Sequence, residues 1–157
     1  MAVKLSEIIN FRTMRMEDLW QGCNIEKKSY DHPWSEKVLK NCLLYKYDCY
    51  VAIQQGIILG YFFSQISYPE THLLNLTVDK DYRNHGIATE FMNLILSKAK
   101  THKSESIILE TRETNDAAIK LYKKFKFKSI GIRPRYYRTK NGWEDALVFC
   151  REINYPR

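Results

Sequence analysis

The stretch VDKDYRNHGIATEFMNLIL, residues 78–96, joins a strand pattern to an amphipathic helix at a lone glycine, Gly86. The chain has only six glycines, and this one stands between a polar run and a row of helix formers, with the small residue Ala88 two positions later. A helix that begins here exposes unpaired N–H groups and the positive end of its dipole. The stretch therefore predicts a strand, loop and helix whose loop can bind an anion.

Hydrophobic periodicity predicts an alternation of strands and helices along the whole chain. Expected strands lie near residues 8–14, 72–79 and 104–112, in a hairpin over 48–67 that turns at Gln55-Gly56, and in a closing pair over 128–137 and 144–153. Expected helices lie near residues 17–29, 36–44, 86–100 and 115–125. In the first of them Leu19, Trp20, Cys23 and Ile25 can lie on one side, and Ser35 is the expected N-cap of the second. This order predicts the α/β class, with a mixed, largely antiparallel sheet of seven strands flanked by about four helices.

Length and composition predict one globular domain over residues 1–157. Apolar residues make up 45% and charged residues 27% of the chain, which is typical of a packed protein rather than of disorder. No apolar run reaches the roughly 18 residues of a membrane span, and the opening residues lack the features of a signal peptide. We therefore expect a cytoplasmic protein with no membrane partner.

The four cysteines are scattered, with no C-x-x-C pair and no histidine at ligand spacing. This arrangement predicts reduced thiols, with neither a disulfide framework nor a metal site. The net charge of +7 and the pI near 9.2 indicate an anionic partner. A nucleic acid, a ribosome and a phosphorylated cofactor all fit, and charge alone does not choose among them.

Residues 83–88, RNHGIA, allow two interpretations. A large phosphate reaches the amides of a helix terminus only where no Cβ obstructs it, so Gly86 and Ala88 could form a cradle to which Arg83 adds a charged contact. Alternatively, Gly86 only permits a positive φ at the entrance to the helix. This stretch alone leaves both interpretations open.

RNHGIA fits the Q/R-x-x-G-x-G/A signature of the GNAT superfamily of N-acetyltransferases, and it lies between the fourth strand and the third helix as in that family. Three further stretches, DHPWSEKVL, ILETRETNDAAIKLYKKFKF and RYYRTKNGWEDALVF, resemble one branch of it, the RimI-type ribosomal-protein alanine N-acetyltransferases. The resemblance runs from about Ile8 to Glu152. It implies a GNAT fold and acetyl-CoA as cosubstrate.

The resemblance also implies where the coenzyme binds. The RNHGIA loop would hold the pyrophosphate through its amides, and the pantetheine arm would pair with strand backbone where two parallel strands splay apart beside a bulged fourth strand. Asn115 would bond this arm, although from its position it could equally be a helix N-cap. The implied contacts are Leu76, Thr77, Val78, Arg83, Asn84, His85, Gly86, Ile87, Ala88, Thr89, Asn115 and Tyr122.

Glu110 is the candidate general base. It ends the apolar run SIILE, so we expect it at the carboxyl end of a buried strand, with its pKa raised by desolvation. An ion pair with Arg112 or a lysine is the alternative role. The resemblance assigns Glu110 as base and Tyr122, otherwise a core aromatic, as the general acid for the leaving thiolate. It implies direct attack in a ternary complex, with no cysteine nucleophile.

An N-terminal α-amino group has a pKa of about 7.7–8.0 and needs only a modest base, whereas a lysine at about 10.4 needs far more. The resemblance implies a narrow peptide slot that admits a small first residue such as alanine; tyrosines packing a sheet edge are the alternative. The implied walls are His32, Pro33, Trp34, Tyr136 and Tyr137. The acids expected to offset repulsion of a basic substrate tail are Glu26, Asp31, Glu36, Glu144 and Asp145.

Three functions follow from these features. The first is N-terminal acetylation of a ribosomal protein by a monomer or weak homodimer, with no direct binding of nucleic acid. The second keeps the fold and acetyl-CoA but acetylates lysine side chains or a small amine. The third is a basic protein that binds the ribosome or RNA without catalysis. One departure from the family concerns stability alone: Lys126 stands where glycine usually ends the last helix, which should weaken that cap by about 1 kcal/mol.

Overall fold

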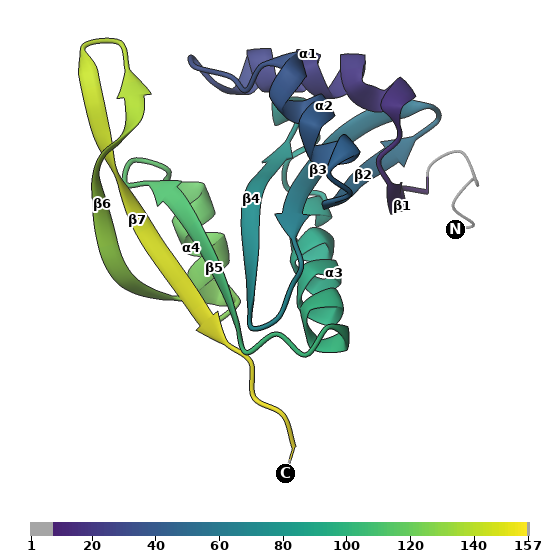
Figure 1. Cartoon of the computed structure of the whole chain (residues 1–157). Helices are drawn as coiled ribbons and strands as arrows, with labels where there is room; N and C mark the ends of the chain where they lie inside the picture. The colour runs from purple at the N-terminus through teal and green to yellow at the C-terminus, as the bar shows by residue number, and fades with distance from the viewer. Residues whose placement is uncertain (1–7, 157) are drawn as a thin grey trace. The chain divides into compact units, whose positions relative to one another are not determined.

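The structure is a computed structural model of the chain, and it describes residues 8–156 (Figure 1). The chain forms two compact units, one of residues up to 63 together with 75–91 and the other of 64–74 together with 92–157. The prediction of a single domain over the whole chain stays a prediction. None of the helices in the described range has both the length and the apolar character needed to cross a membrane.

The predicted alternation of strands and helices is confirmed. The strands are β1 (Asn10–Thr13), β2 (Asp48–Gln54), β3 (Ile57–Gln65), β4 (Glu70–Val78), β5 (Ser106–Arg112), β6 (Lys128–Thr139) and β7 (Gly142–Glu152). The α-helices are α1 (Leu19–Ser29), α2 (Glu36–Leu44), α3 (Ile87–Thr101) and α4 (Asp116–Lys124), and the short 3-10 helices are η2 (Met16–Asp18) and η3 (Lys80–Tyr82). Hydrogen bonds join the seven strands in the order β1-β2-β3-β4-β5-β7-β6. The pairs β1–β2, β5–β7 and β6–β7 are antiparallel, and β4–β5 is parallel.

Aromatic side chains form the core of the first unit. Tyr61, Phe62 and Phe63 on β3 are fully buried. The rings of Phe11 and Phe62 each meet the ring of Phe91 edge to face, at centroid distances of 5.5 and 5.3 Å. Edge-to-face contacts of this kind add to the free energy of burial, so they fix the start of α3 against β1 and β3.

The predicted inner face of α1 was wrong at one position. Leu19 and Cys23 are buried as expected, but the side chain of Trp20 is 65% exposed. Gly22 and Glu26 complete the buried face instead. A Cβ on Gly22 would lie only 3.0 Å from the end of the Met14 side chain, so a small residue is needed on this side of the helix. The positions of the apolar residues alone did not show which side of α1 faces the core.

In the second unit, β5 lies between β4 and β7. Its buried residues alternate, with Ile107 and Leu109 in the core. The ladder with β7 covers the whole of β5, whereas the parallel ladder with β4 joins Glu70–Leu73 to Ser106–Leu109 and stops there. The last three residues of β5 therefore have a ladder partner on the β7 side only, and Glu110 is the first of them.

The end of α4 shows the expected departure from the family. Lys126 has a φ of 66°, the left-handed conformation that favours glycine. Its N–H donates to the carbonyl of Lys123 at 3.0 Å, and that of Phe127 donates to Tyr122 at 3.0 Å. These two bonds form a Schellman cap, which is made here by a residue that pays a steric cost in this conformation.

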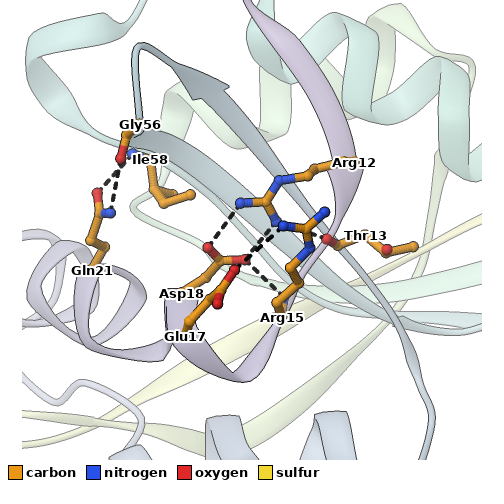
Figure 2. A network of polar contacts seen from close by, with 8 residues as sticks. All are labelled: Arg12, Thr13, Arg15, Glu17, Asp18, Gln21, Gly56 and Ile58. Carbon is orange, nitrogen blue, oxygen red and sulfur yellow. Dashed lines mark hydrogen bonds and ion pairs between the residues drawn. The ribbon is translucent and has the colours of Figure 1, made fainter.

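Two polar clusters fasten α1 and η2 to neighbouring strands. The guanidinium of Arg12 donates two hydrogen bonds to the carboxylate of Asp18, at 2.7 and 3.0 Å (Figure 2). The backbone N–H of Arg15 donates to the same carboxylate at 2.8 Å. Burial would raise the pKa of Asp18, but the bonds from Arg12 and Arg15 hold it below its usual range. In the second cluster, the amide of Gln21 bonds the backbone of Gly56 and Ile58 and so holds the β2–β3 turn.

We expect Asp18→Asn to lower the free energy of unfolding by roughly 2 kcal/mol at neutral pH, because Arg12 loses its charged partner. A lowered folded-state pKa stabilises above the ordinary aspartate pKa of about 3.9 and ceases to do so as pH falls through the folded value. The difference between parent and variant should therefore shrink at acidic pH. Urea unfolding from neutral to acidic pH measures this, with Glu17→Gln as control because Glu17 is an exposed neighbour with one 3.4 Å contact. A difference that does not change with pH would contradict the assignment.

Candidate active site

The loop before α3 has the backbone shape that the sequence predicted. Asn84 and Gly86 both have positive φ, 65° and 79°. The carbonyl of Gly86 accepts from the N–H of Glu90 at 3.1 Å, so Gly86 is the N-cap of α3. A Cβ built on Gly86 would meet no atom within 4 Å. The positive φ supports the conformational interpretation, and the open space above the glycine leaves room for a ligand beside the first amides of the helix.

Side chains within this segment hold its shape. His85 Nδ1 lies 2.8 Å from the carbonyl of Arg83, and Arg83 Nε lies 3.4 Å from the carbonyl of Val78. Asp79 accepts from the N–H of Asp81 at 3.1 Å and from Lys28 Nζ at 3.0 Å. The first amides of α3 have no partner within the helix, as at any helix N-terminus. These residues fit the predicted phosphate cradle, and the contact expected from Arg83 stays a prediction.

The end of β4 approaches β3 very closely. A Cβ on Gly60 would lie 2.8 Å from the carbonyl oxygen of Thr77, so only glycine fits there. The N–H of Asp79 donates to Leu59 at 2.8 Å, on the same side of the strand. Residues 76–78 lie beyond the ladder that β4 makes with β5. This segment fits the strand backbone that the family resemblance assigns to the pantetheine arm.

Glu26 is a buried carboxylate, 1% exposed, at the centre of a polar network. Its Oε1 accepts from Tyr61 Oη at 2.9 Å and from Asn75 Nδ2 at 2.6 Å, and its Oε2 accepts from the backbone N–H of Trp34 at 3.0 Å. Burial, with the negative charge of Glu26, raises the pKa of Tyr61, which therefore stays a donor. The network continues from Asn75 Oδ1 to Thr77 Oγ1 at 2.8 Å. It ties the loop of Trp34 to the end of β4.

Glu26 is therefore too buried to contact a basic substrate directly, and the expectation that its charge offsets the charge of the substrate stays a prediction. Its carboxylate is directed into the protein, where three donors compensate for the loss of water. Two other acids of that set are also engaged: Glu144 accepts from Thr114 Oγ1 at 2.7 Å, and Asp145 accepts from the N–H of Arg135 at 3.0 Å. Asp31 and Glu36 remain exposed.

The predicted slot residues lie on two segments, the loop before α2 in the first unit and strand β6 in the second. In the first unit, His32 and Pro33 are exposed, and the ring of Trp34 lies 5.9 Å from that of Phe63. In the second unit, the rings of Tyr136 and Tyr137 meet at 90° with centroids 4.9 Å apart. Both groups expose aromatic surface that could contact a peptide. Their role as walls of one slot stays a prediction.

An irregularity in β6 presents the two tyrosines. The register moves from Arg133 opposite Ala146 to Tyr137 opposite Glu144, which leaves extra residues on β6. Arg135 there has a φ of 51°. A bulge of this kind redirects side chains at the rim of a sheet. Pro134, which cannot donate to a ladder, is the sequence signal that could have located it.

Glu110 lies beside His72 and Arg133. Its side chain is 6% exposed; Oε2 lies 2.7 Å from His72 Nε2, and Oε1 lies 3.5 Å from Arg133 Nη2. Among residues 8–156, no donor hydrogen-bonds Oε1. The hydrogen bond from His72 is the largest influence and lowers the pKa of Glu110, burial opposes it, and the charges of His72 and Arg133 add to the lowering. The expected rise in this pKa was therefore wrong.

The sequence pointed to neither His72 nor Arg133 as a neighbour of Glu110, and the alternative ion pair of Glu110 with Arg112 was wrong. Arg112 instead lies 3.4 Å from Glu144, with its guanidinium 4.6 Å from the centre of the Tyr137 ring. The β4–β5 register, which sets His72 opposite Ile108, brings the histidine onto the side of the sheet that Glu110 occupies. Residues 38 positions apart acquire this contact only when the two strands pair.

Tyr122 and Asn115 lie on or beside α4. Asn115 Oδ1 accepts from the N–H of Ala118 at 3.2 Å, so the expected capping role is confirmed. Tyr122 is 7% exposed and packs its ring near Phe127 and Phe149, as expected of a core aromatic. The functions that the family resemblance adds, a bond to pantetheine and proton donation to the thiolate, stay predictions.

The cysteines are free thiols, and burial raises the pKa of each of them. A raised thiol pKa reduces the thiolate fraction at neutral pH, which does not suit a nucleophile. In the described range, no group of three or more His, Cys, Asp or Glu side chains could hold a metal ion.

The comparisons with known proteins define the class. The Acetyltransferase (GNAT) family matches residues 14–127, so the chain belongs to this family. The [ribosomal protein bS18]-alanine N-acetyltransferase of Escherichia coli K12 is 29% identical over 142 residues, which cover 90% of this chain and 96% of that one. The Haemophilus ducreyi protein of the same name is 30% identical over 136 residues, or 87% and 94% of the two chains.

Solved structures give the same fold. The crystal structure of the ribosomal-protein-S18-alanine N-acetyltransferase from Escherichia coli superposes with a TM-score of 0.87 at 27% identity, covering 96% of this chain and 97% of that one. Arabidopsis thaliana NAA60 in complex with acetyl-CoA superposes with a TM-score of 0.85 at 18% identity, covering 94% and 100%, a likeness of fold alone. The predictions of the fold and of the enzyme class are confirmed.

We expect Glu26→Gln to lower the free energy of unfolding by about 1–3 kcal/mol, because the new amide N–H₂ must face one of three hydrogen-bond donors. Urea unfolding measures the change. Glu36→Gln is the matched control, because Glu36 is exposed in the first turn of α2 and should lose only a few tenths of a kcal/mol. Equal losses in the two variants would show that the network around Glu26 has little energetic weight.

Proposed function

We propose that this chain transfers the acetyl group of acetyl-CoA to the α-amino group of an N-terminal alanine on a ribosomal protein. GNAT acetyltransferases take this group from acetyl-CoA, which is therefore the cosubstrate. Relatives that align over most of their length carry this activity in their names. The cytoplasmic location, the monomeric or weakly dimeric state and the absence of nucleic-acid binding stay predictions.

The proposal rests mainly on one observation, that Oε1 of Glu110 is buried and lacks a hydrogen-bond donor within residues 8–156. A buried carboxylate normally has donors on both oxygens, but Oε1 has no hydrogen-bond donor among the described residues. Such an oxygen can accept a proton from an incoming amine, directly or through a water. Its lowered pKa makes it a mild base, which suits an α-amino group that is already partly neutral near pH 7.5 better than it suits a lysine.

The candidate site residues have separate roles in binding acetyl-CoA and in transferring protons. When bound, acetyl-CoA supplies an acetyl group activated as a thioester. The amides beside Gly86 hold the pyrophosphate, and Asn115 with the backbone of residues 76–78 orients the pantetheine arm. Glu110 takes the proton that the attacking nitrogen loses, and Tyr122 gives a proton to the departing sulfur. The cysteines take no part, since burial keeps their thiols protonated.

The acceptor would meet aromatic side chains from the loop before α2 and from strand β6. As the family resemblance implies, His32, Pro33 and Trp34 would form one wall of the slot, and Tyr136 and Tyr137 would form the other. Tyrosine hydroxyls can bind the first peptide carbonyls, and closely spaced rings exclude a large first side chain. The bond from Glu26 to the backbone of Trp34 supports this assignment, because a slot must be rigid to measure the size of a side chain.

A short Ala-starting peptide tests the acceptor. We expect acetylation of the free peptide and none of the same peptide with a blocked N-terminus, both carrying an internal lysine, because only the α-amino group is partly neutral near pH 7.5. Mass spectrometry of the products after incubation with acetyl-CoA measures this. Product from the blocked peptide would favour the lysine alternative; no product from either, with no saturable binding of acetyl-CoA, would favour the non-catalytic one.

We expect Glu110→Gln to cut turnover by about tenfold or more at neutral pH, because an amide cannot take up the proton of the amine. Coenzyme affinity should not change, since the cradle amides lie on another segment. Steady-state kinetics and calorimetry with coenzyme A measure the two effects. Glu113→Gln is the control, because Glu113 is an exposed carboxylate three residues further along the chain. An unchanged rate in Glu110→Gln would remove Glu110 from the mechanism.

A further inference from the structure

We infer that His72 is a positioning residue for the general base: it holds one oxygen of Glu110 and so presents the other to the acceptor amine. The inference deepens the proposed function and rests on it. His72 is not among the residues that the family resemblance assigned, and it acts through Glu110 rather than on the substrate.

The geometry of the pair supports this division of roles. An ionised carboxylate can only accept, so the 2.7 Å contact requires that His72 Nε2 carries the hydrogen and donates it to Oε2. The imidazole is 31% exposed and Glu110 only 6%, so the histidine is the more solvent-exposed member of the pair. With Oε2 occupied, the hydrogen-bonding capacity that remains to the carboxylate is mainly at Oε1.

The alternative anchor is Arg133, and its geometry is poorer. Arg133 Nη2 lies 3.5 Å from Oε1, beyond the usual range of an N–H···O hydrogen bond, and its side chain is 54% exposed. On β7, the residue opposite Glu110 is the apolar Val148. The next cation along β5, Arg112, pairs with Glu144 rather than with Glu110. A short hydrogen bond from His72 is therefore the contact that fixes the carboxylate.

A buried carboxylate without this donor would lose much of what keeps it ionised. Burial favours the protonated form, and a protonated Glu110 cannot take the proton that leaves the amine as the new N–C bond forms. His72 therefore contributes twice, by fixing the orientation of the carboxylate and by favouring its charged state. Loss of His72 should raise the pKa of Glu110, because its largest lowering influence disappears.

The test compares His72→Ala and His72→Gln with the parent, and His102→Ala serves as control because His102 is exposed on the turn after α3. Side-chain carboxyl ¹³C signals of labelled glutamate follow the titration, with Glu110 assigned by the signal lost in Glu110→Gln. In His72→Ala we expect Glu110 to titrate at higher pH than in the parent. In His72→Gln we expect a smaller shift in the same direction, because the amide of glutamine can still donate a hydrogen bond to Oε2.

Kinetics give the second readout. In His72→Ala we expect kcat/KM to fall about tenfold at neutral pH and its acidic limb to move to higher pH, with unchanged affinity for coenzyme A. His102→Ala should behave as the parent does. An identical Glu110 titration in the parent and in the two His72 variants would overturn the inference. The Glu110 titration could instead shift in the His72 variants while the parent acetylates no free N-terminus. That result would overturn the proposed acceptor and leave the interaction between His72 and Glu110 supported.

Discussion

Three buried carboxylates, those of Asp18, Glu26 and Glu110, constrain how the elements of this structure pack. A carboxylate removed from water must regain its hydrogen bonds or meet a cation, or its burial opposes folding. Asp18 meets this need with the guanidinium of Arg12, and Glu26 with three neutral donors. Both groups are fully engaged and hold secondary structure together. Glu110 differs, because one of its oxygens is bonded and the other is not.

That difference is the reason why we assign Glu110, and neither Asp18 nor Glu26, to the proposed chemistry. A half-satisfied carboxylate costs stability, and such sites persist where reactivity requires them. Burial also explains why the proposed chemistry uses no cysteine, because it raises the pKa of each thiol and so favours the protonated form. It also gives Glu26 a role that its position on an amphipathic helix did not suggest. Its carboxylate joins the backbone of Trp34 to the end of β4 through Asn75.

Much of the fold could be read from local pattern. Four local features appear as expected: the glycine at 86, the Gln55-Gly56 turn and the helix caps at Ser35 and Asn115. Each depends only on residues a few positions apart in the sequence. Two expectations were wrong for a shared reason. The exposure of Trp20 and the lowered pKa of Glu110 depend on neighbours far away in the sequence, which periodicity does not contain.

The sequence by itself determined the order of the elements, the glycine-containing loop before α3 and the family, because these rest on short-range patterns and on motifs in a set order. Only the tertiary structure decided which side chains contact Glu110, which buried acid binds the backbone of Trp34 and which residues of β6 leave the ladder. Strand pairing explains the difference, because the β4–β5 register brings residue 72 to residue 110. No local preference of either residue encodes that register, which follows from the packing of the assembled sheet.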